Sequence, residues 1–231
     1  MARHLIVSAT QFEIQPVLQR LDMHSMFEGT QGAAFRRGSQ NVDVLVSGVG
    51  QMQTSFHLGQ ALMREQYSSV LNFGIAGSFR PQFAKCSLVH VVQEELADLG
   101  ADDNGRAIDL FEMKLLNRNV DPFQDGVLTA LPLELDSISD LPKVKSITVN
   151  RVLGAESSIA AAVAKYDPDV VNMEGAAVFY ATRLSGIRCA SIRAISDQVG
   201  PRDKSKWDIP GAIKNLCMKA NEILDELLEQ N

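Results

Sequence analysis

The chain has 231 residues, of which 45% are hydrophobic and 22% charged, and these values are ordinary for one globular domain with a full core. Its formal net charge of −6 argues against a nucleic-acid partner, because binding to a phosphate backbone needs a clustered basic face. No apolar run approaches the roughly 18 residues of a membrane span, and the first residues turn polar too early for a signal peptide. We therefore expect one domain in the cytoplasm, with no membrane partner.

Cysteine and histidine usage agrees with that compartment. Cys86, Cys189 and Cys217 are far apart and two of them lie in apolar runs, as is typical of core thiols in a reducing environment. The four histidines show no spacing typical of metal ligands. We expect neither a metal nor a cofactor.

The first third of the chain predicts alternating strands and helices. Strands are predicted at 4–8, 33–38, 42–47 and 70–73, and helices at 12–21 and 54–66. Glu13 lies where the first strand gives way to the first helix. The glycines that follow the later strands would let a backbone approach a ligand closely, but their spacing fits neither a Rossmann nor a Walker A motif.

The middle of the chain, about 94–145, is the least regular part and is rich in aspartate, glycine and proline. A long irregular insertion in a compact domain is usually a binding loop, a lid or an interface segment. Strands are predicted on either side of it, at 86–92 and 146–152, and a short helix at 159–165.

Two carboxylates follow two predicted strands in the stretch 170–207. An apolar pair leads into Glu174, small residues then allow a tightly packed helix, and a second apolar run ends at Asp197. The ligand crevice of an α/β sheet lies beyond the carboxyl ends of its strands, so both acids are expected to face one crevice. An amphipathic core helix at 209–228 follows.

Four segments together resemble the nucleoside phosphorylase and nucleosidase superfamily: 6–13, 47–50, 71–77 and 171–197. The resemblance implies a single α/β domain built as a three-layer sandwich with a central mixed, partly barrel-like sheet. It also implies a small purine nucleoside as the substrate. Subunits of this superfamily pair, so a homodimer or a higher homo-oligomer is expected.

The resemblance also implies three chemical roles. Asp197 matches the acid that protonates the leaving purine, and Glu174 with the Met173 backbone matches the clamp on the ribose hydroxyls. Glu13 matches the base that activates water in the nucleosidase branch. We further assign a set of residues to substrate binding, with stacking on the purine by Phe73 or by a Phe or Leu near Val152; this set is Phe73, Gly74, Val152, Ser196 and Arg202.

Water is the expected nucleophile. Phosphorylases of the superfamily carry an arginine in the first strand–helix loop and further phosphate ligands at the glycine-rich turn. Residues 8–12 here contain no cation, and a phosphate without such donors would be poorly paired.

The run Val-Gly-Pro-Arg-Asp-Lys-Ser-Lys-Trp at 199–207 resembles the futalosine hydrolase branch, which removes hypoxanthine from futalosine on a route to menaquinone. Futalosine carries a carboxylate, which Arg202, Lys204 or Lys206 could pair, Arg202 best because its guanidinium binds in a bidentate way. The run could also be solvated surface. Three other functions stay open: a methylthioadenosine or S-adenosylhomocysteine nucleosidase, a purine nucleoside phosphorylase, and a non-catalytic nucleoside-binding protein.

Overall fold

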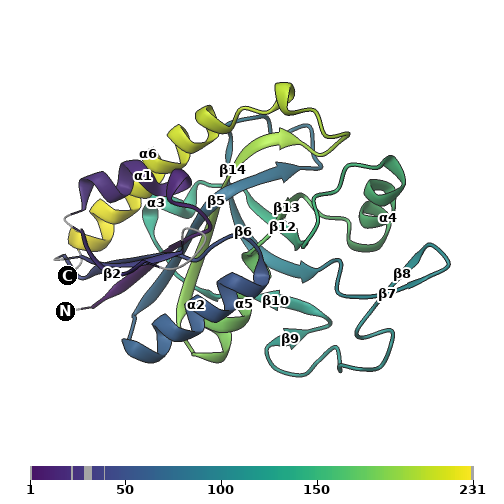
Figure 1. Ribbon diagram of the computed structural model, residues 1–231, viewed down its shortest axis with the longest axis horizontal. Helices are drawn as coiled ribbons and strands as arrows, with labels where there is room; N and C mark the ends of the chain where they lie inside the picture. The colour runs from purple at the N-terminus through teal and green to yellow at the C-terminus, as the bar shows by residue number, and fades with distance from the viewer. Residues whose placement is uncertain (1, 22, 29–32, 39, 230–231) are drawn as a thin grey trace.

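A computed structural model describes residues 2–21, 23–28, 33–38 and 40–229 (Figure 1). Its helices are α1 (Gln11–Arg20), α2 (Gln51–Arg64), α3 (Asp136–Ser139), α4 (Glu156–Tyr166), α5 (Gly175–Leu184) and α6 (Ile209–Glu229), with a 3₁₀ turn, η2, at Lys204–Lys206. Its strands are β1 (His4–Ser8), β2 (Met23–Glu28), β3 (Ala34–Gly38), β4 (Val42–Val46), β5 (Ser69–Ser78), β6 (Leu88–Leu96), β7 (Gly100–Asp103), β8 (Arg106–Asp109), β9 (Phe123–Gln124), β10 (Val127–Thr129), β11 (Leu131–Pro132), β12 (Lys143–Thr148), β13 (Val170–Asn172) and β14 (Arg188–Gln198).

The main sheet is mixed and closes partly into a barrel. Strands β14, β6, β12, β13 and β5 follow one another, and β14 also pairs with β5, so these strands form a ring. From β5 the sheet continues through β1, β4, β3 and β2. This arrangement confirms the expected fold class.

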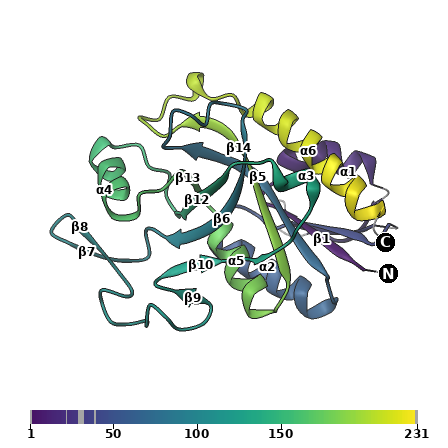
Figure 2. The ribbon, with the colours of Figure 1, turned by 180° about the vertical axis from the view of Figure 1, so that it is seen from behind.

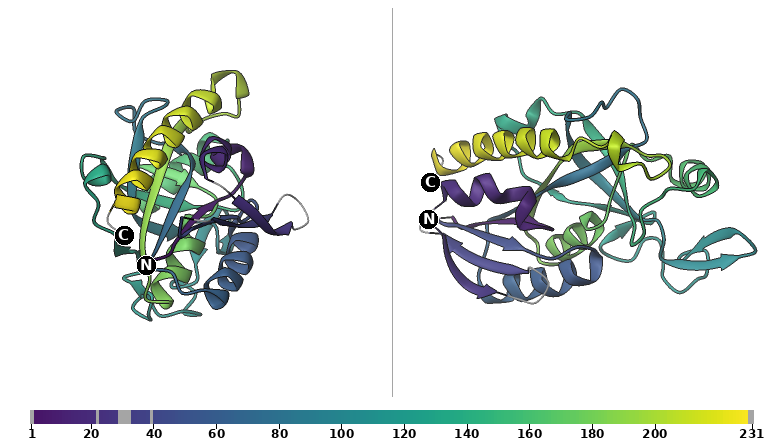
Figure 3. Two further views of the ribbon diagram at one scale, coloured as in Figure 1. Left: turned by 90° about the vertical axis from the view of Figure 1, so that its left-hand side faces the viewer. Right: turned by 45° about the horizontal axis from the view of Figure 1, so that its top comes forward.

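Helices cover the sheet on two sides and make three layers (Figures 1 and 3). On one side α1, α3 and α6 bury Ile14, Ile138 and Leu216 against the sheet. On the other side α2 and α5 bury Leu58 and Phe179. Helix α6 has buried residues at spacings of three and four, which is the pattern that predicted it as a core helix.

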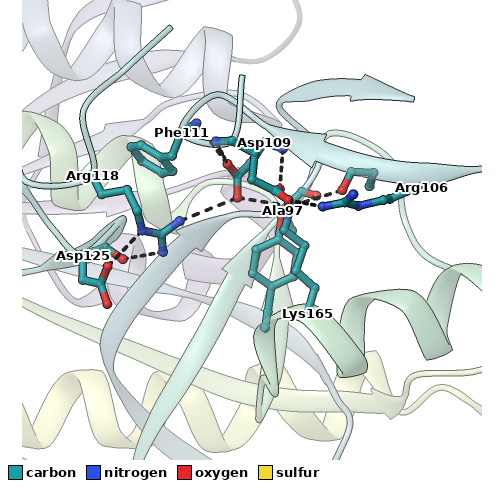
Figure 4. A network of polar contacts seen from close by, with 10 residues as sticks. Ala97, Arg106, Asp109, Phe111, Arg118, Asp125 and Lys165 are labelled. Atoms are coloured by element: carbon teal, nitrogen blue, oxygen red, sulfur yellow. Dashed lines mark hydrogen bonds and ion pairs between the residues drawn. The ribbon is translucent and has the colours of Figure 1, made fainter. Parts of the chain in front are cut away.

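The insertion at 94–145 contains more regular structure than the sequence indicated, namely the hairpins β7–β8 and β9–β10, strand β11 and helix α3. Figures 1 and 2 show β7 and β8 next to α4 at one end of the molecule. Lys165 of α4 binds Asp109 at 3.1 Å and also contacts Glu112, and Arg118 binds Asp125 at 2.9 Å (Figure 4). The Lys165 contacts hold the insertion against α4, whereas the pair of Arg118 and Asp125 lies within the insertion.

Several boundaries differ from the predicted ones. Strand β5 continues through the glycines to Ser78, because its backbone pairs with β14 along that whole length. Strand β2 and helix α3 were not predicted at all. In the described ranges, no helix combines the length and the apolar character needed to cross a membrane.

Candidate active site

A cavity of about 350 Å³ lies where β1, β5, β13 and β14 meet the loops that follow them. The side chains of Glu13, Glu174 and Asp197 all line it. Its other lining residues are Ala9, Thr10, Phe12, Val49, Ile75, Ala76, Gly77, Val149, Val152, Leu153, Val171, Asn172, Met173, Ser196, Val199, Trp207, Ile209 and Ile213. Within the described ranges, the wall thus carries three carboxylates and no lysine, arginine or histidine.

Glu13 is fixed by a capping box at the start of α1. Its Oε2 accepts hydrogen bonds from the Thr10 backbone N–H at 3.0 Å and from the Thr10 hydroxyl at 2.8 Å, while Oε1 accepts from the Ile75 N–H at 3.1 Å. The side chain of Thr10 accepts in turn from the Glu13 N–H. The carboxylate is therefore held between α1 and β5, and one of its edges reaches the cavity.

Glu174 occupies the N-cap position of α5, but its side chain does not cap that helix. Instead Oε1 accepts a hydrogen bond from the Gly50 N–H at 2.8 Å, at the start of α2. Burial raises the pKa of the Glu174 carboxyl, and the negative charge of Glu13 adds to this rise. The Gly50 hydrogen bond and the positive charge of Arg193 act in the opposite direction.

Asp197 lies near the end of β14, at a bulge where the register against β5 shifts. The Ser196 hydroxyl donates a hydrogen bond to its Oδ1 at 2.6 Å. Burial raises the pKa of the Asp197 carboxyl, and the Ser196 hydrogen bond partly opposes that rise. A raised pKa is what a group needs if it is to deliver a proton near neutral pH.

Three predicted binding residues lie off the cavity wall. Phe73 is 1% exposed and packs in the core shared by α1 and α6, so it does not face the cavity where stacking was expected. Gly74 lies behind Glu13, since a Cβ built on it would meet Glu13 Oε1 at 3.3 Å. Arg202 is exposed, and its backbone N lies 3.8 Å from a Cβ built on Gly154, beside the wall residue Leu153. Leu153, next to Val152, lines the cavity.

Arg193 was missed by the sequence reasoning. It is 2% exposed, it lies in β14 opposite Gly74, and its Nη1 would be 2.7 Å from a Cβ there. Its Nε and Nη2 donate to no partner within the described residues. An arginine inside the apolar run 189–195 is the signal that could have identified it, because a buried charge needs compensating charges nearby. Trp207 was also missed: the sequence indicated no role for it beyond its place in the run 199–207, but it lines the cavity.

Asp98 holds the loop that carries Val152 and Leu153. Its Oδ2 accepts from the backbone N–H groups of Asn150 at 2.5 Å and Arg151 at 3.3 Å, and its Oδ1 accepts from Asn150 Nδ2 at 2.9 Å. Residues 94–145, all of which the structure describes, otherwise contribute nothing to the cavity wall. The idea that this insertion is a lid gains no support from its position.

The arrangement places three carboxyl groups around one small cavity, and carboxyl groups can donate or accept protons and accept hydrogen bonds from hydroxyl groups. Among the described residues, no group of three or more His, Cys, Asp or Glu side chains is placed to hold a metal ion.

Comparisons with known proteins agree on the family. The model of the phosphorylase superfamily matches residues 3–229. The futalosine hydrolase of Acidothermus cellulolyticus is 32% identical over 222 residues, covering 93% of this chain and 87% of that protein. The futalosine hydrolase of Thermus thermophilus is 29% identical, covering 79% of this chain and 80% of that protein.

Solved structures share the fold. A mutant of the Helicobacter pylori futalosine hydrolase superposes with a TM-score of 0.81 at 17% identity, covering 98% of this chain and 100% of that one. A methylthioadenosine/S-adenosylhomocysteine nucleosidase from Colwellia psychrerythraea, in complex with adenine, superposes with a TM-score of 0.77 at 19% identity, covering 99% of this chain and 95% of that one.

Proposed function

The chain belongs to the phosphorylase superfamily and, within it, to the family of the futalosine hydrolases, and from this premise we propose that it hydrolyses the N-glycosidic bond of futalosine. It is a glycosidic-bond hydrolase. The products would be hypoxanthine and the remaining sugar, on a route to menaquinone.

We assign the acid and the ribose clamp as follows. Asp197 donates its proton to N7 of the purine while the bond from C1′ to N9 breaks, and the electron pair of that bond stays on the base. Glu174 accepts hydrogen bonds from the ribose hydroxyls, which strengthen as positive charge develops on the sugar. The raised pKa of Asp197 supports its role as the acid.

Glu13 accepts a proton from water as the water oxygen bonds to C1′, which completes hydrolysis. Its three hydrogen bonds hold the carboxylate in one orientation before any ligand arrives. Arg193 supplies positive charge beside this group, because its Nη1 and Glu13 Oε1 both approach the Cβ position of Gly74.

The observation that carries hydrolysis over phosphorolysis is the charge of the cavity wall. Three carboxylates line it and no described wall residue is cationic. A phosphate dianion in this cavity would be repelled by those carboxylates and would lack paired donors, whereas a neutral water would not.

Recognition of the substrate carboxylate is assigned to Arg202. This exposed guanidinium belongs to the loop next to Gly154, outside the wall formed by Val152 and Leu153. Trp207, on the cavity wall, provides an aromatic face for the rest of the 5′ substituent. Carboxylate pairing at the mouth would separate futalosine from nucleosides with a neutral 5′ group.

We further propose a homo-oligomer that forms through α2. Met52, Phe56 and Met63 are 81%, 61% and 91% exposed, and their spacing puts them on one side of the helix. Val49, half exposed just before α2, lines the cavity and joins this apolar stripe to its mouth. Phe56→Glu should give monomers in sedimentation velocity, and Met218→Glu, at an exposed position on α6, should not.

The cytoplasm is the proposed location. All three cysteines are free, which fits a reducing compartment.

Two measurements test the proposed function. Turnover of futalosine should be unchanged when phosphate or arsenate is added, and the sugar product should carry no phosphate at C1′ by NMR. Arg202→Ala should reduce kcat/KM for futalosine by about 10-fold, as expected for a lost charged hydrogen bond, and leave inosine unaffected. Lys206→Ala is the matched control, because Lys206 pairs with Asp203 at 3.6 Å. Acceleration by phosphate would contradict hydrolysis.

A further inference from the structure

We propose that Glu94 is a positioning residue for ribose binding, which acts on Glu174 through Asn172 and Thr148. This inference rests on the proposed function in one respect, namely that Glu174 grips the ribose. Glu94 does not line the cavity, and nothing in the chemistry assigned above uses it.

Glu94 is completely buried, with 0% exposure, inside the ring of strands. Its Oε1 accepts a hydrogen bond from Asn172 Nδ2 at 2.7 Å, and its Oε2 accepts from the Thr148 hydroxyl at 2.8 Å. A buried carboxylate is costly unless it is paired and hydrogen-bonded. Two neighbouring strands, β12 and β13, thus each supply one donor to it.

Those two partners hold the start of α5. Asn172 Oδ1 accepts from the backbone N–H of Glu174 at 2.9 Å and of Gly175 at 2.6 Å. Thr148 Oγ1 accepts from the Ala176 N–H at 2.8 Å. Three successive N–H groups at the N-terminus of the helix are therefore satisfied from β12 and β13, and none by the N-cap side chain itself.

This arrangement leaves the carboxylate of Glu174 available for a ligand. A residue at an N-cap position would ordinarily bond its own helix. Here Asn172 and Thr148 accept hydrogen bonds from the first N–H groups of the helix. Glu174 instead accepts from the Gly50 N–H and faces the cavity. Glu94 orients both of these side chains: the Thr148 hydroxyl donates to one of its oxygens, and Asn172 Nδ2 donates to the other while it also donates to Ser146 Oγ at 2.7 Å.

Gly175 makes the arrangement sterically possible. A Cβ built at this position would lie 1.8 Å from Glu94 Oε1 and 2.8 Å from Asn172 Nδ2. No side chain fits there while Glu94 keeps its place. The position of Glu94 therefore requires glycine at 175, about eighty residues later in the chain.

Charge is consistent with this role. Burial raises the pKa of Glu94 to about 7, while the positive charge of Arg193 and the hydrogen bonds from Thr148 and Asn172 act to lower it. The positive end of the α5 dipole also faces the carboxylate and favours its ionised form.

The test is ligand binding measured by the fluorescence of Trp207, the single tryptophan of the chain and a wall residue. One probe is formycin B, a nucleoside whose carbon–carbon link between base and sugar resists hydrolysis, and the other is hypoxanthine. Glu94→Gln should weaken formycin B binding by about 10-fold to 100-fold, the range for losing a hydrogen bond to a charged group. Hypoxanthine binding should change less than about twofold, because the base does not use Glu174.

Glu95→Gln is the matched control. It makes the same chemical change at the next position of β6, on the opposite face of the strand, where Glu95 is half-buried. It should leave the binding of both probes unchanged.

A second comparison separates positioning from general damage. In a Glu174→Gln background, Glu94→Gln should have almost no further effect on formycin B, because its effect passes through Glu174. Thr148→Val should behave like Glu94→Gln and Thr148→Ser like the unaltered protein, so the inference stays testable if Glu94→Gln does not fold. Equal weakening of both probes, or the same loss with and without Glu174, would overturn the proposal.

The two proposals can fail separately. If futalosine is not hydrolysed but the binding pattern holds, the proposed function is wrong and the positioning role stands. If futalosine is hydrolysed and Glu94→Gln binds formycin B normally, the positioning role is wrong. If the unaltered protein hydrolyses futalosine without binding formycin B, KM for futalosine replaces the formycin B affinity, and an unchanged KM in Glu94→Gln overturns the positioning role.

Discussion

Replacing Glu13 by glutamine should cost stability as well as turnover. Both carboxylate oxygens accept from N–H groups: Oε2 from Thr10 and Oε1 from Ile75. A glutamine amide has only one oxygen, so its NH₂ group must face one of these donors. The variant therefore loses at least one buried hydrogen bond, which costs about 1–3 kcal/mol. For a chain of this size we expect Tm to fall by about 2–4 °C for each kcal/mol.

The loss of turnover should be much larger than the loss of stability implies. Removing a general base costs about 10²-fold to 10⁴-fold in kcat. Binding of formycin B should be spared, because the ribose and purine contacts assigned to Glu174 and Asp197 are untouched.

Base release at saturating futalosine, thermal unfolding and formycin B binding together test this prediction. Thr10→Val is the control, because it removes the 2.8 Å hydroxyl contact to Glu13 while it keeps the carboxylate. It should lower Tm by a similar amount and kcat by far less than Glu13→Gln does, because the carboxylate that takes the proton is kept. Unaltered turnover in Glu13→Gln would remove Glu13 from the mechanism.

Three further outcomes are expected. Burial raises the pKa of Asp197, and catalysis needs its protonated form, so kcat should fall as pH rises through that raised pKa. Asp197→Asn should lose about 10²-fold to 10⁴-fold in kcat at all pH values. Burial raises the pKa of Glu94 from 4.5 to about 7, so between these pH values the folded state binds more protons than the unfolded state. The free energy of unfolding, measured with urea, should therefore fall by about 3 kcal/mol as pH rises from 4.5 to 7. Glu94→Gln should lack this contribution. Gly74→Ala puts a Cβ 2.7 Å from Arg193 Nη1 and should abolish base release in a folded protein. Gly59→Ala in α2 is the control, because a Cβ there meets nothing within 4 Å. It should keep activity and raise the free energy of unfolding by about 0.5–1 kcal/mol in chemical denaturation.

The convergence of Glu174 and Asp197 was predictable from local pattern, because each follows a short apolar run and the ends of neighbouring strands meet at one edge of a sheet. Glu13 was added to them by the resemblance to a known superfamily. The roles of all three came from the same resemblance. Closure of the sheet into a ring also came from that resemblance, because pairing between β14 and β5 joins residues more than a hundred positions apart.

Pairing between strands that are distant in the sequence explains why two residues were misplaced. Phe73 was placed at a strand end, but β5 runs on through the glycines to Ser78 and leaves Phe73 inside the core. Glu94 was taken only as the start of the irregular insertion at 94–145. Only the ring of strands turns Glu94 inward, and that closure has no signal in the local sequence.

The central claim is tested most directly by mixing the purified protein with futalosine, inosine and methylthioadenosine in phosphate-free buffer and measuring released base by chromatography. The account predicts hypoxanthine from futalosine with little from inosine, which would make the loop of Arg202 the specificity element. Adenine from methylthioadenosine in preference to hypoxanthine from futalosine would contradict the proposed substrate, while leaving the three carboxylates in their roles.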